Sequence, residues 1–395
     1  MKRVQLKHIT SFLFLLIIFT PIIISGIYFI SGVRLDTTLT NDNSSHINPP
    51  VFSASVFWDG SFQAQFEKYF NIKFPPRNSI VKTYNQLSFL MFGEAKNLTI
   101  RDGYIYEKSY LEDYAGRSYN PADSKVKQEL DSYIQTLEQI SQKLEQKGKK
   151  LIVYSTPNKC DYTKEHIPQK YQNAKLKNNY FLTPFEYFNQ NINSEKVTYI
   201  NYLPILETVN YPIFYKNGIH WSRPAEQTVS QKVIQTINDF YGNVKPLEFT
   251  GICHSTEQIY REEDIAKIAN LWFYNDEIYY EFETKTFQEG NFKKPTIFIQ
   301  GDSFAEGLFT DIKQNEITDT CYLAFRDNLI RDIQNNVIAD TRKFKQEGIT
   351  IWETPQLPKL IEESDIICIE FCSSIMNLRS FGFTDYLNEM LGEVS

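Results

Sequence analysis

The chain is poor in the residues that carry redox and metal chemistry. It has five cysteines and five histidines among 395 residues. No two cysteines are spaced as CxxC, which argues against a zinc ribbon and against a thioredoxin-type motif. The histidines are scattered and show no metal-ligand spacing. We therefore expect neither a bound metal nor a cofactor.

Basic charge is also in short supply. Lysine and arginine number 41 against 48 aspartates and glutamates, a formal charge of −7. The first 35 residues hold four bases and no acid, so the rest of the chain carries 37 basic residues against 48 acidic ones. Nucleic-acid-binding domains show a basic surface, so we expect no nucleic acid partner. Glycine and proline, 16 of each, are too few for a collagen-like or low-complexity chain.

The longest uncharged segment lies near the N-terminus. Residues 9–33 carry no charge, which exceeds the roughly 20 apolar residues that a membrane-spanning helix needs. Lys2, Arg3 and Lys7 precede this segment, and positive charge stays in the cytoplasm. The apolar region of a cleaved signal peptide is shorter, roughly 7–15 residues. We predict an uncleaved anchor over residues 1–35, with the body in the periplasm or outside the cell.

Beyond a polar linker at residues 36–56, short apolar runs alternate with amphipathic helices. This alternation indicates an α/β fold with a parallel sheet and helices on both faces. The predicted strands are residues 151–154, 197–200, 296–299 and 366–369, and the clearest helical stripes lie in residues 123–147 and 222–240.

We expect one domain over residues 57–395, interrupted by a β-rich insertion at about 245–292. The domain begins with a helical segment, residues 57–92, which is broken at Phe74-Pro75-Pro76. Its aromatic stripe is typical of a core-facing helix, and a membrane-surface role is the alternative this close to the anchor.

A serine follows the third predicted strand, in the sequence Gly301-Asp302-Ser303-Phe304. A serine at a strand-to-helix turn exposes its hydroxyl at the sheet edge where α/β proteins bind ligands. Its backbone N–H can then join an oxyanion site, with Gly301 beside it. The alternative is an ordinary helix N-cap, which favours the same residue types. We expect Asp302 to brace the turn rather than to catalyse.

A histidine precedes another predicted helix, in His220-Trp221-Ser222. His220 is placed to act as a general base, and a partly buried structural histidine is the alternative. Trp221 is a candidate substrate contact. Lys159 follows the first predicted strand, and it either contacts the substrate or acyl donor or is a solvated loop lysine.

Together these clusters resemble a known family. GDSF after a strand is the signature of SGNH hydrolases, and a His-Trp motif that precedes the serine resembles the polysaccharide O-acetyltransferases of the alginate acetylation type. Ordinary SGNH enzymes place the histidine motif near the C-terminus, so the order here is permuted. Four further segments match this family's pattern in order: residues 71–77, 101–106, 156–168 and 369–378.

The resemblance implies that Ser303 is the acetyl-accepting nucleophile and His220 its base. Asn377 is a candidate donor to the oxyanion, with a loop cap as the alternative. The family has an aspartate two residues before the histidine, where this chain has Gly218. Such an acid fixes the histidine tautomer and stabilises the imidazolium. Asn217 could accept the Nδ1 hydrogen bond instead, an acid from elsewhere could supply it, or the histidine has no partner.

Three functions fit this pattern. The resemblance implies an anchored O-acetyltransferase outside the cytoplasm, which receives acetyl groups from a multipass membrane acyltransferase and passes them to a polysaccharide hydroxyl. A carbohydrate acetyl esterase shares the acyl-enzyme chemistry, with water as the final acceptor. A polysaccharide-binding or assembly protein without activity is the third, with Gly218 as the mark of a decayed triad.

Removal of residues 1–35 should leave a soluble, folded body, because the linker has few apolar residues and little core is lost with it. Size-exclusion chromatography without detergent checks this expectation. Aggregation of the shortened chain would mean that the anchor packs on the body or that residues 57–92 bind the membrane.

Overall fold

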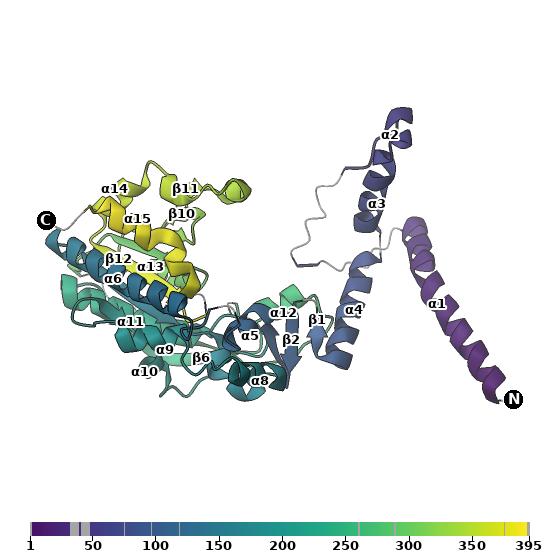
Figure 1. The fold of residues 1–395 in the computed structure, drawn as a ribbon, viewed down its shortest axis with the longest axis horizontal. Coiled ribbons are helices and arrows are strands. Elements are labelled where there is room, and N and C mark those ends of the chain that lie inside the picture. Colours follow the sequence, from purple (N-terminus) through teal and green to yellow (C-terminus); the bar gives the residue numbers. More distant parts are fainter. Residues whose placement is uncertain are drawn as a thin grey trace. The chain divides into compact units, whose positions relative to one another are not determined.

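The computed structural model of the chain describes residues 2–31, 39–40, 48–74, 76–95, 97–117, 119–259, 261–287, 290–374 and 376–392 (Figure 1). These form two compact units, residues 1–100 with 265–274 and residues 101–264 with 275–395. The units divide at residue 100 and not at the expected domain boundary, residue 57. Of the predicted linker, residues 36–38 and 41–47 lie outside the described ranges.

The first unit begins with α1 (Lys2–Ser31). Within the described ranges, α1 is the one helix long and apolar enough to cross a membrane, over His8–Tyr28 with a mean hydropathy of 2.3. The hydroxyls of Thr20 and Ser25 donate to carbonyls four residues earlier, at 2.6 and 2.7 Å. These donors are satisfied inside the helix, as a lipid environment requires.

The rest of this unit is mainly helical, and its aromatic stripe does not form a core. It consists of α2 (Ala54–Trp58), α3 (Ser61–Lys73), α4 (Arg77–Phe92), β1 (Glu94–Ala95), the start of β2 (Leu98–Arg101) and most of α12 (Asp264–Ala269). Phe62, Phe66 and Phe70 stack along α3 with ring centroids about 6 Å apart. No side chain of α3 is buried, so the assignment of this stripe to the core is wrong.

The second unit is built on a sheet of seven strands within the described ranges, in the order β11-β10-β9-β8-β12-β4-β5. The five strands from β9 to β5 are parallel, and β10 and β11 add an antiparallel edge. The predicted α/β architecture is confirmed, and the four predicted strands are β8, β12, β4 and β5. The strand bounds are β4 (Lys150–Thr156), β5 (Thr198–Ile200), β8 (Ile297–Gly301), β9 (Cys321–Phe325), β10 (Leu329–Asp332), β11 (Val337–Asp340) and β12 (Ile366–Cys372).

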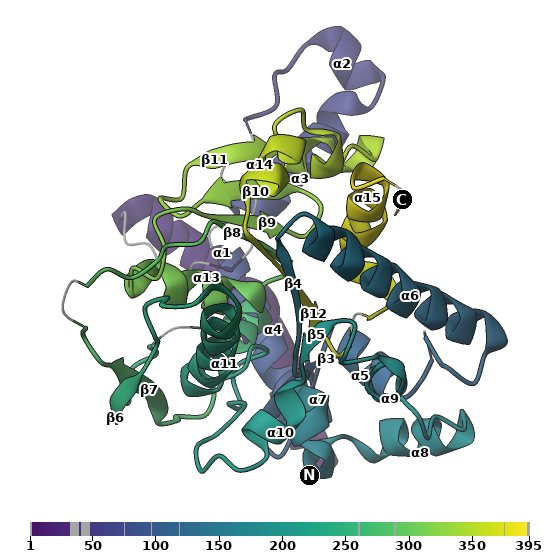
Figure 2. The ribbon, with the colours of Figure 1, turned by 90° about the vertical axis from the view of Figure 1, so that its left-hand side faces the viewer.

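Helices cover both faces of this sheet (Figure 2). The pair α6 (Ser124–Gln146) and α15 (Phe383–Met390) lies on one face, and α11 (Arg223–Tyr241) and α13 (Ala305–Gln314) lie on the other. The expected insertion forms a separate two-stranded sheet of β6 (Phe249–Ser255) and β7 (Tyr279–Thr284). The remaining elements are β3 (Tyr104–Glu107), α5 (Lys108–Tyr114), α7 (Lys159–Tyr162), η2 (Lys164–His166), α8 (Gln169–Lys177), α9 (Pro184–Asn191), α10 (Tyr202–Leu206), η3 (Arg342–Glu347), η4 (Ile351–Glu353), α14 (Leu357–Glu363) and η5 (Met376–Gly382).

A buried ionic network joins α11 to α13. The Arg223 guanidinium donates to Glu226 Oε1 at 2.5 Å and to Asp311 Oδ1. All three side chains are buried, and a Cβ at Gly307 would overlap Glu226, so the helices approach closely here. Burial, together with the Asp311 carboxylate, raises the pKa of Glu226 to about 7 although Arg223 opposes the shift. The network fixes the two helices that follow His220 and Ser303.

Glu226 should make the fold more stable in mild acid than at neutral pH. Its pKa is higher in the folded chain than the ordinary 4.5, so its contribution is complete below pH 4.5 and is lost as pH rises through about 7. Glu226→Gln should therefore reduce the difference in unfolding free energy between pH 5 and pH 8 by ~1–3 kcal/mol. Denaturant unfolding of the full chain in detergent measures this difference.

Glu145→Gln is the matched control, because Glu145 lies on the exposed surface of α6. An identical pH dependence in wild type and Glu226→Gln would contradict the assigned shift.

Candidate active site

Ser303 lies in the turn between β8 and α13, at the carboxyl end of the sheet. The turn is braced from both sides. The Asp302 amide donates to Glu370 Oε2 at 3.0 Å, and Asp302 Oδ1 accepts the Phe304 amide at 2.8 Å. Gly301 is required by this packing, since a Cβ there would lie 2.6 Å from Glu370 Oε2. Asp302 thus holds the turn, as the sequence indicated.

Glu370 is a buried acid under this turn. It belongs to β12, and its Oε1 lies 2.5 Å from the Thr156 hydroxyl of β4. Burial raises the pKa of Glu370 well above its ordinary value, and the Asp302 carboxylate adds to the shift. We therefore expect Glu370 to be protonated at neutral pH, so that it fixes the turn without placing a negative charge beneath the serine.

His220 joins Ser303 to an acid that the sequence reading did not identify. Its Nε2 lies 2.7 Å from Ser303 Oγ, and its Nδ1 is hydrogen-bonded to Asp264 Oδ2. Asp264 Oδ1 also accepts the Ile219 amide at 2.8 Å, which orients the carboxylate. An ionised Asp264 keeps the proton on Nδ1, so Nε2 can accept the Ser303 hydroxyl proton. The three side chains form the geometry of a Ser-His-Asp triad.

Asp264 lies 44 residues after His220, within the inserted segment. The same segment supplies Arg261, which donates to the Ser303 carbonyl at 3.0 Å. The available signal in the sequence is the charged run of residues 261–264, directly before a short helix. Nothing in its spacing from the His-Trp motif identifies Asp264 as the partner of His220.

Gly218 permits this arrangement. A Cβ at Gly218 would lie 2.7 Å from the Glu262 carbonyl oxygen, so a side chain there would collide with the backbone that carries Asp264. The family's usual aspartate position is thus filled by the approach of another segment. The acid has moved rather than been lost.

Asn217 is not the partner of His220, and the expectation that it could orient the imidazole is wrong. Its Nδ2 donates to the Asn275 carbonyl at 2.5 Å, and its Oδ1 is buried without a hydrogen-bond donor among the described residues. The Asn217 and Lys216 amides donate to the Glu277 carboxylate at 3.1 and 2.8 Å. Asn217 helps to fix the loop before His220.

Lys159 is buried, so both readings of this residue from the sequence are wrong. Its ammonium donates to the carbonyls of Ile105, Lys216 and Gly218 at 2.9, 2.8 and 2.7 Å. These bonds use its three donors and leave none for a substrate. Burial lowers the pKa of Lys159 to about 7, while the three carbonyl acceptors favour the charged form. Lys159 anchors the loop that carries His220.

Trp221 is also buried rather than available to a substrate. It is 3% exposed and packs against Phe304, with ring centroids 5.9 Å apart. The proposed substrate contact through Trp221 is therefore wrong. The backbone of Asn377 lies in η5, but its side chain is outside the described part of the chain, so its oxyanion role stays a prediction. Among the described residues, no cluster of three His, Cys, Asp or Glu could hold a metal ion.

Residues 114–339 match the family model of the SGNH hydrolase-like domain of the acetyltransferase AlgX. The chain belongs to this family. The matched region contains Ser303, His220 and Asp264, and it covers more than half of the chain. Glu370 and Asn377 lie beyond it.

Solved structures with a similar fold include three proteins described as, or related by name to, acetylation enzymes. The O-acetyltransferase domain of Pseudomonas putida AlgJ is 9% identical with a TM-score of 0.40, over 74% of this chain and 99% of that one. Pseudomonas aeruginosa AlgX is 13% identical with a TM-score of 0.40, over 75% and 68%. Bacillus cereus PatB1 is 10% identical with a TM-score of 0.40, over 70% and 96%. No curated protein matches the chain.

Asp264→Asn should lower kcat for a simple acetyl ester by up to ~10⁴-fold, the effect of the equivalent change in serine proteases. The amide removes the charge that stabilises the imidazolium and permits the wrong tautomer, while KM should change little. Steady-state kinetics with 4-nitrophenyl acetate measures both constants.

Glu257→Gln is the control, because Glu257 is exposed in the same inserted segment. Wild-type kcat in Asp264→Asn, at an unchanged melting temperature, would show that Asp264 does not orient the base.

Proposed function

We propose that this chain is an O-acetyltransferase that acts outside the cytoplasm on a hydroxyl of an exopolysaccharide or cell-envelope glycan. The observation that carries the proposal is the hydrogen-bonded line from Asp264 through His220 to Ser303, in a chain of an acetyltransferase family. This line ends on a serine at the carboxyl edge of a parallel sheet, where α/β enzymes hold their ligands.

The first half of the reaction loads the enzyme. Ser303 Oγ attacks the carbonyl carbon of the acetyl donor, and its proton moves to His220 Nε2. The Asp264 carboxylate stabilises the imidazolium that results. The Ser303 amide is placed to donate to the developing oxyanion, because it accepts no protein partner among the described residues. The donor's leaving group takes the proton from His220 and departs, which leaves acetyl-Ser303.

The second half transfers the acetyl group. A sugar hydroxyl gives its proton to His220 Nε2 and attacks the acetyl carbonyl. Collapse of the second tetrahedral intermediate breaks the bond to Ser303 Oγ, and His220 returns the proton to the serine. The product is an acetylated sugar, and the enzyme returns to its starting state.

We assign α1 the role of an uncleaved anchor that holds the body at the outer side of the membrane. The basic residues before the anchor and the acidic body after it support this orientation. The acetyl donor in this account is a multipass membrane acyltransferase, as the family resemblance implies. A polysaccharide supplies the acceptor hydroxyl.

A serine-reactive ester probe should label wild-type protein and leave Ser303→Ala unlabelled. Ser132→Ala, which changes an exposed serine of α6, is the control and should label like wild type. Mass spectrometry of the labelled peptide gives the site. Labelling of Ser303→Ala at the wild-type level would contradict a nucleophilic role for Ser303.

Incubation of the wild type with an acetyl ester and oligosaccharides then separates transfer from hydrolysis. Acetylated sugar in the mass spectrum supports the transferase. Free acetate alone, with every acceptor offered, would identify an esterase and overturn the proposal.

A further inference from the structure

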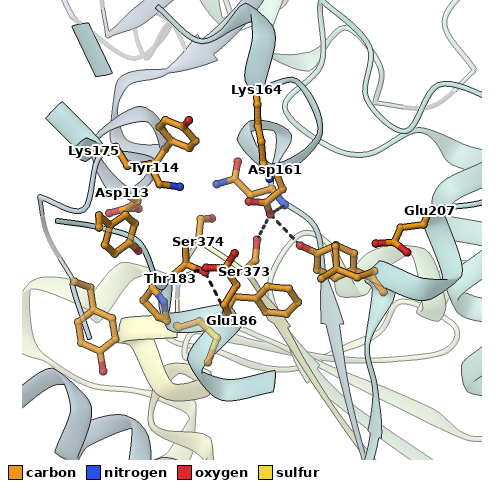
Figure 3. A pocket seen from close by; sticks show the side chains of 18 residues that line it. Asp113, Tyr114, Asp161, Lys164, Lys175, Thr183, Glu186, Glu207, Ser373 and Ser374 are labelled. Carbon is orange, nitrogen blue, oxygen red and sulfur yellow. Dashed lines mark hydrogen bonds between the residues drawn. The ribbon is translucent and has the colours of Figure 1, made fainter. Parts of the chain in front are cut away.

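A cavity of about 290 Å³ lies at the same edge of the sheet as Ser303 (Figure 3). It opens beyond the ends of β4 and β12, because Asp161 follows β4 and Ser373 and Ser374 follow β12. In the sheet β8 neighbours β12, which neighbours β4. With strands ~4.8 Å apart, the end of β4 lies ~10 Å from the end of β8. Neither Ser303 nor His220 lines this cavity, so it is distinct from the triad but within reach of the same oligosaccharide.

Aromatic rings form much of the cavity wall. They come from separate elements and present flat apolar faces beside phenolic hydroxyls: Tyr114, Tyr119, Tyr180, Phe185 and Tyr202. Phe185 and Tyr202 are stacked, with centroids 4.9 Å apart and planes within 8°. Such amphipathic rings suit a ligand that has both apolar faces and hydroxyl groups. The volume is at the small end for ligand pockets, roughly 300–1,000 Å³, and suits a single sugar unit.

Two charged groups in the cavity have unused hydrogen-bonding capacity. Asp161 Oδ2 accepts from Ser373 Oγ at 2.6 Å and Tyr202 OH at 3.0 Å, as Figure 3 shows, but no described residue donates to its Oδ1. The Lys175 ammonium lies 4.6 Å from the centre of the Tyr114 ring, and no described residue accepts a hydrogen bond from it. These groups offer a ligand one acceptor and one donor.

The charge of the lining selects the class of sugar. Four carboxylates, Asp113, Asp161, Glu186 and Glu207, face two ammonium groups, Lys164 and Lys175. No arginine is present among the lining residues, although arginine is the side chain best suited to bind a carboxylate or phosphate in two-point contact. A uronate or a phosphorylated sugar would meet a net negative wall.

We propose that this cavity binds a neutral or amino sugar of the acceptor glycan, near the unit that is acetylated at Ser303. The inference rests on the proposed function and adds the class of the acceptor. Sugar hydroxyl or amino groups donate to Asp161 Oδ1 and Glu207, Lys175 donates to a sugar oxygen, and the rings cover the apolar face.

Calorimetric titration of full-length Ser303→Ala in detergent tests the proposal without turnover. The probes are short oligomers of glucose, N-acetylglucosamine, glucosamine and galacturonate. At least one of the first three should bind at least tenfold more tightly than galacturonate. Lys175→Met, made in the same background, should weaken that binding at least tenfold. Lys177→Met should not, because Lys177 is on the same helix but does not line the cavity.

Glu207→Gln provides a second variant at an exposed position, which is tolerated by the fold. Loss of this carboxylate should narrow the preference for glucosamine over galacturonate severalfold. Tighter binding of galacturonate than of every other probe, wild-type affinity in Lys175→Met, or no binding of any probe at millimolar concentration would each overturn the inference. Sugar binding without Ser303 labelling would overturn only the proposed function, and labelling without sugar binding would overturn only this inference.

Discussion

The hydrogen bond between Asp264 and His220 is the interaction on which the candidate site depends. It keeps the Nδ1 proton in place and so presents Nε2 to the Ser303 hydroxyl as an acceptor. The same carboxylate accepts the Ile219 amide, so the ring and the loop that carries it are fixed together. A histidine without this partner could rotate or take the other tautomer, and the serine would lose its base.

The surrounding structure holds the three side chains in register through buried charges. Lys159 ties the His220 loop to three carbonyls, and the Arg223 network joins the helices that follow His220 and Ser303. Glu370 supports the Ser303 turn from the neighbouring strand. Buried charges of this kind are costly unless they are fully paired. Their concentration around one turn is understandable if the turn must be held in one geometry.

The sequence predicted the framework because buried parallel strands are continuous apolar runs, as in residues 151–154 and 366–369. Ser303 and His220 could be found because each follows a recognisable local pattern. Asp264 could not, since a carboxylate 44 residues away has no spacing rule that relates it to the histidine. Lys159 and Trp221 look like surface residues in their local sequence, and their burial comes from contacts with distant segments. The stripe on α3 shows the reverse error, because periodicity identifies an apolar face without identifying what covers it.

The central claim is that Asp264, His220 and Ser303 act as one unit, and non-additivity of their losses tests it most directly. The measurement compares kcat for an acetyl ester in Asp264→Asn, Ser303→Ala and the double variant. Residues that act as a unit are strongly non-additive. The account therefore predicts that the double variant is no slower than Ser303→Ala alone. Losses that multiply in the double variant would mean that Asp264 acts independently of the serine, and would contradict the account.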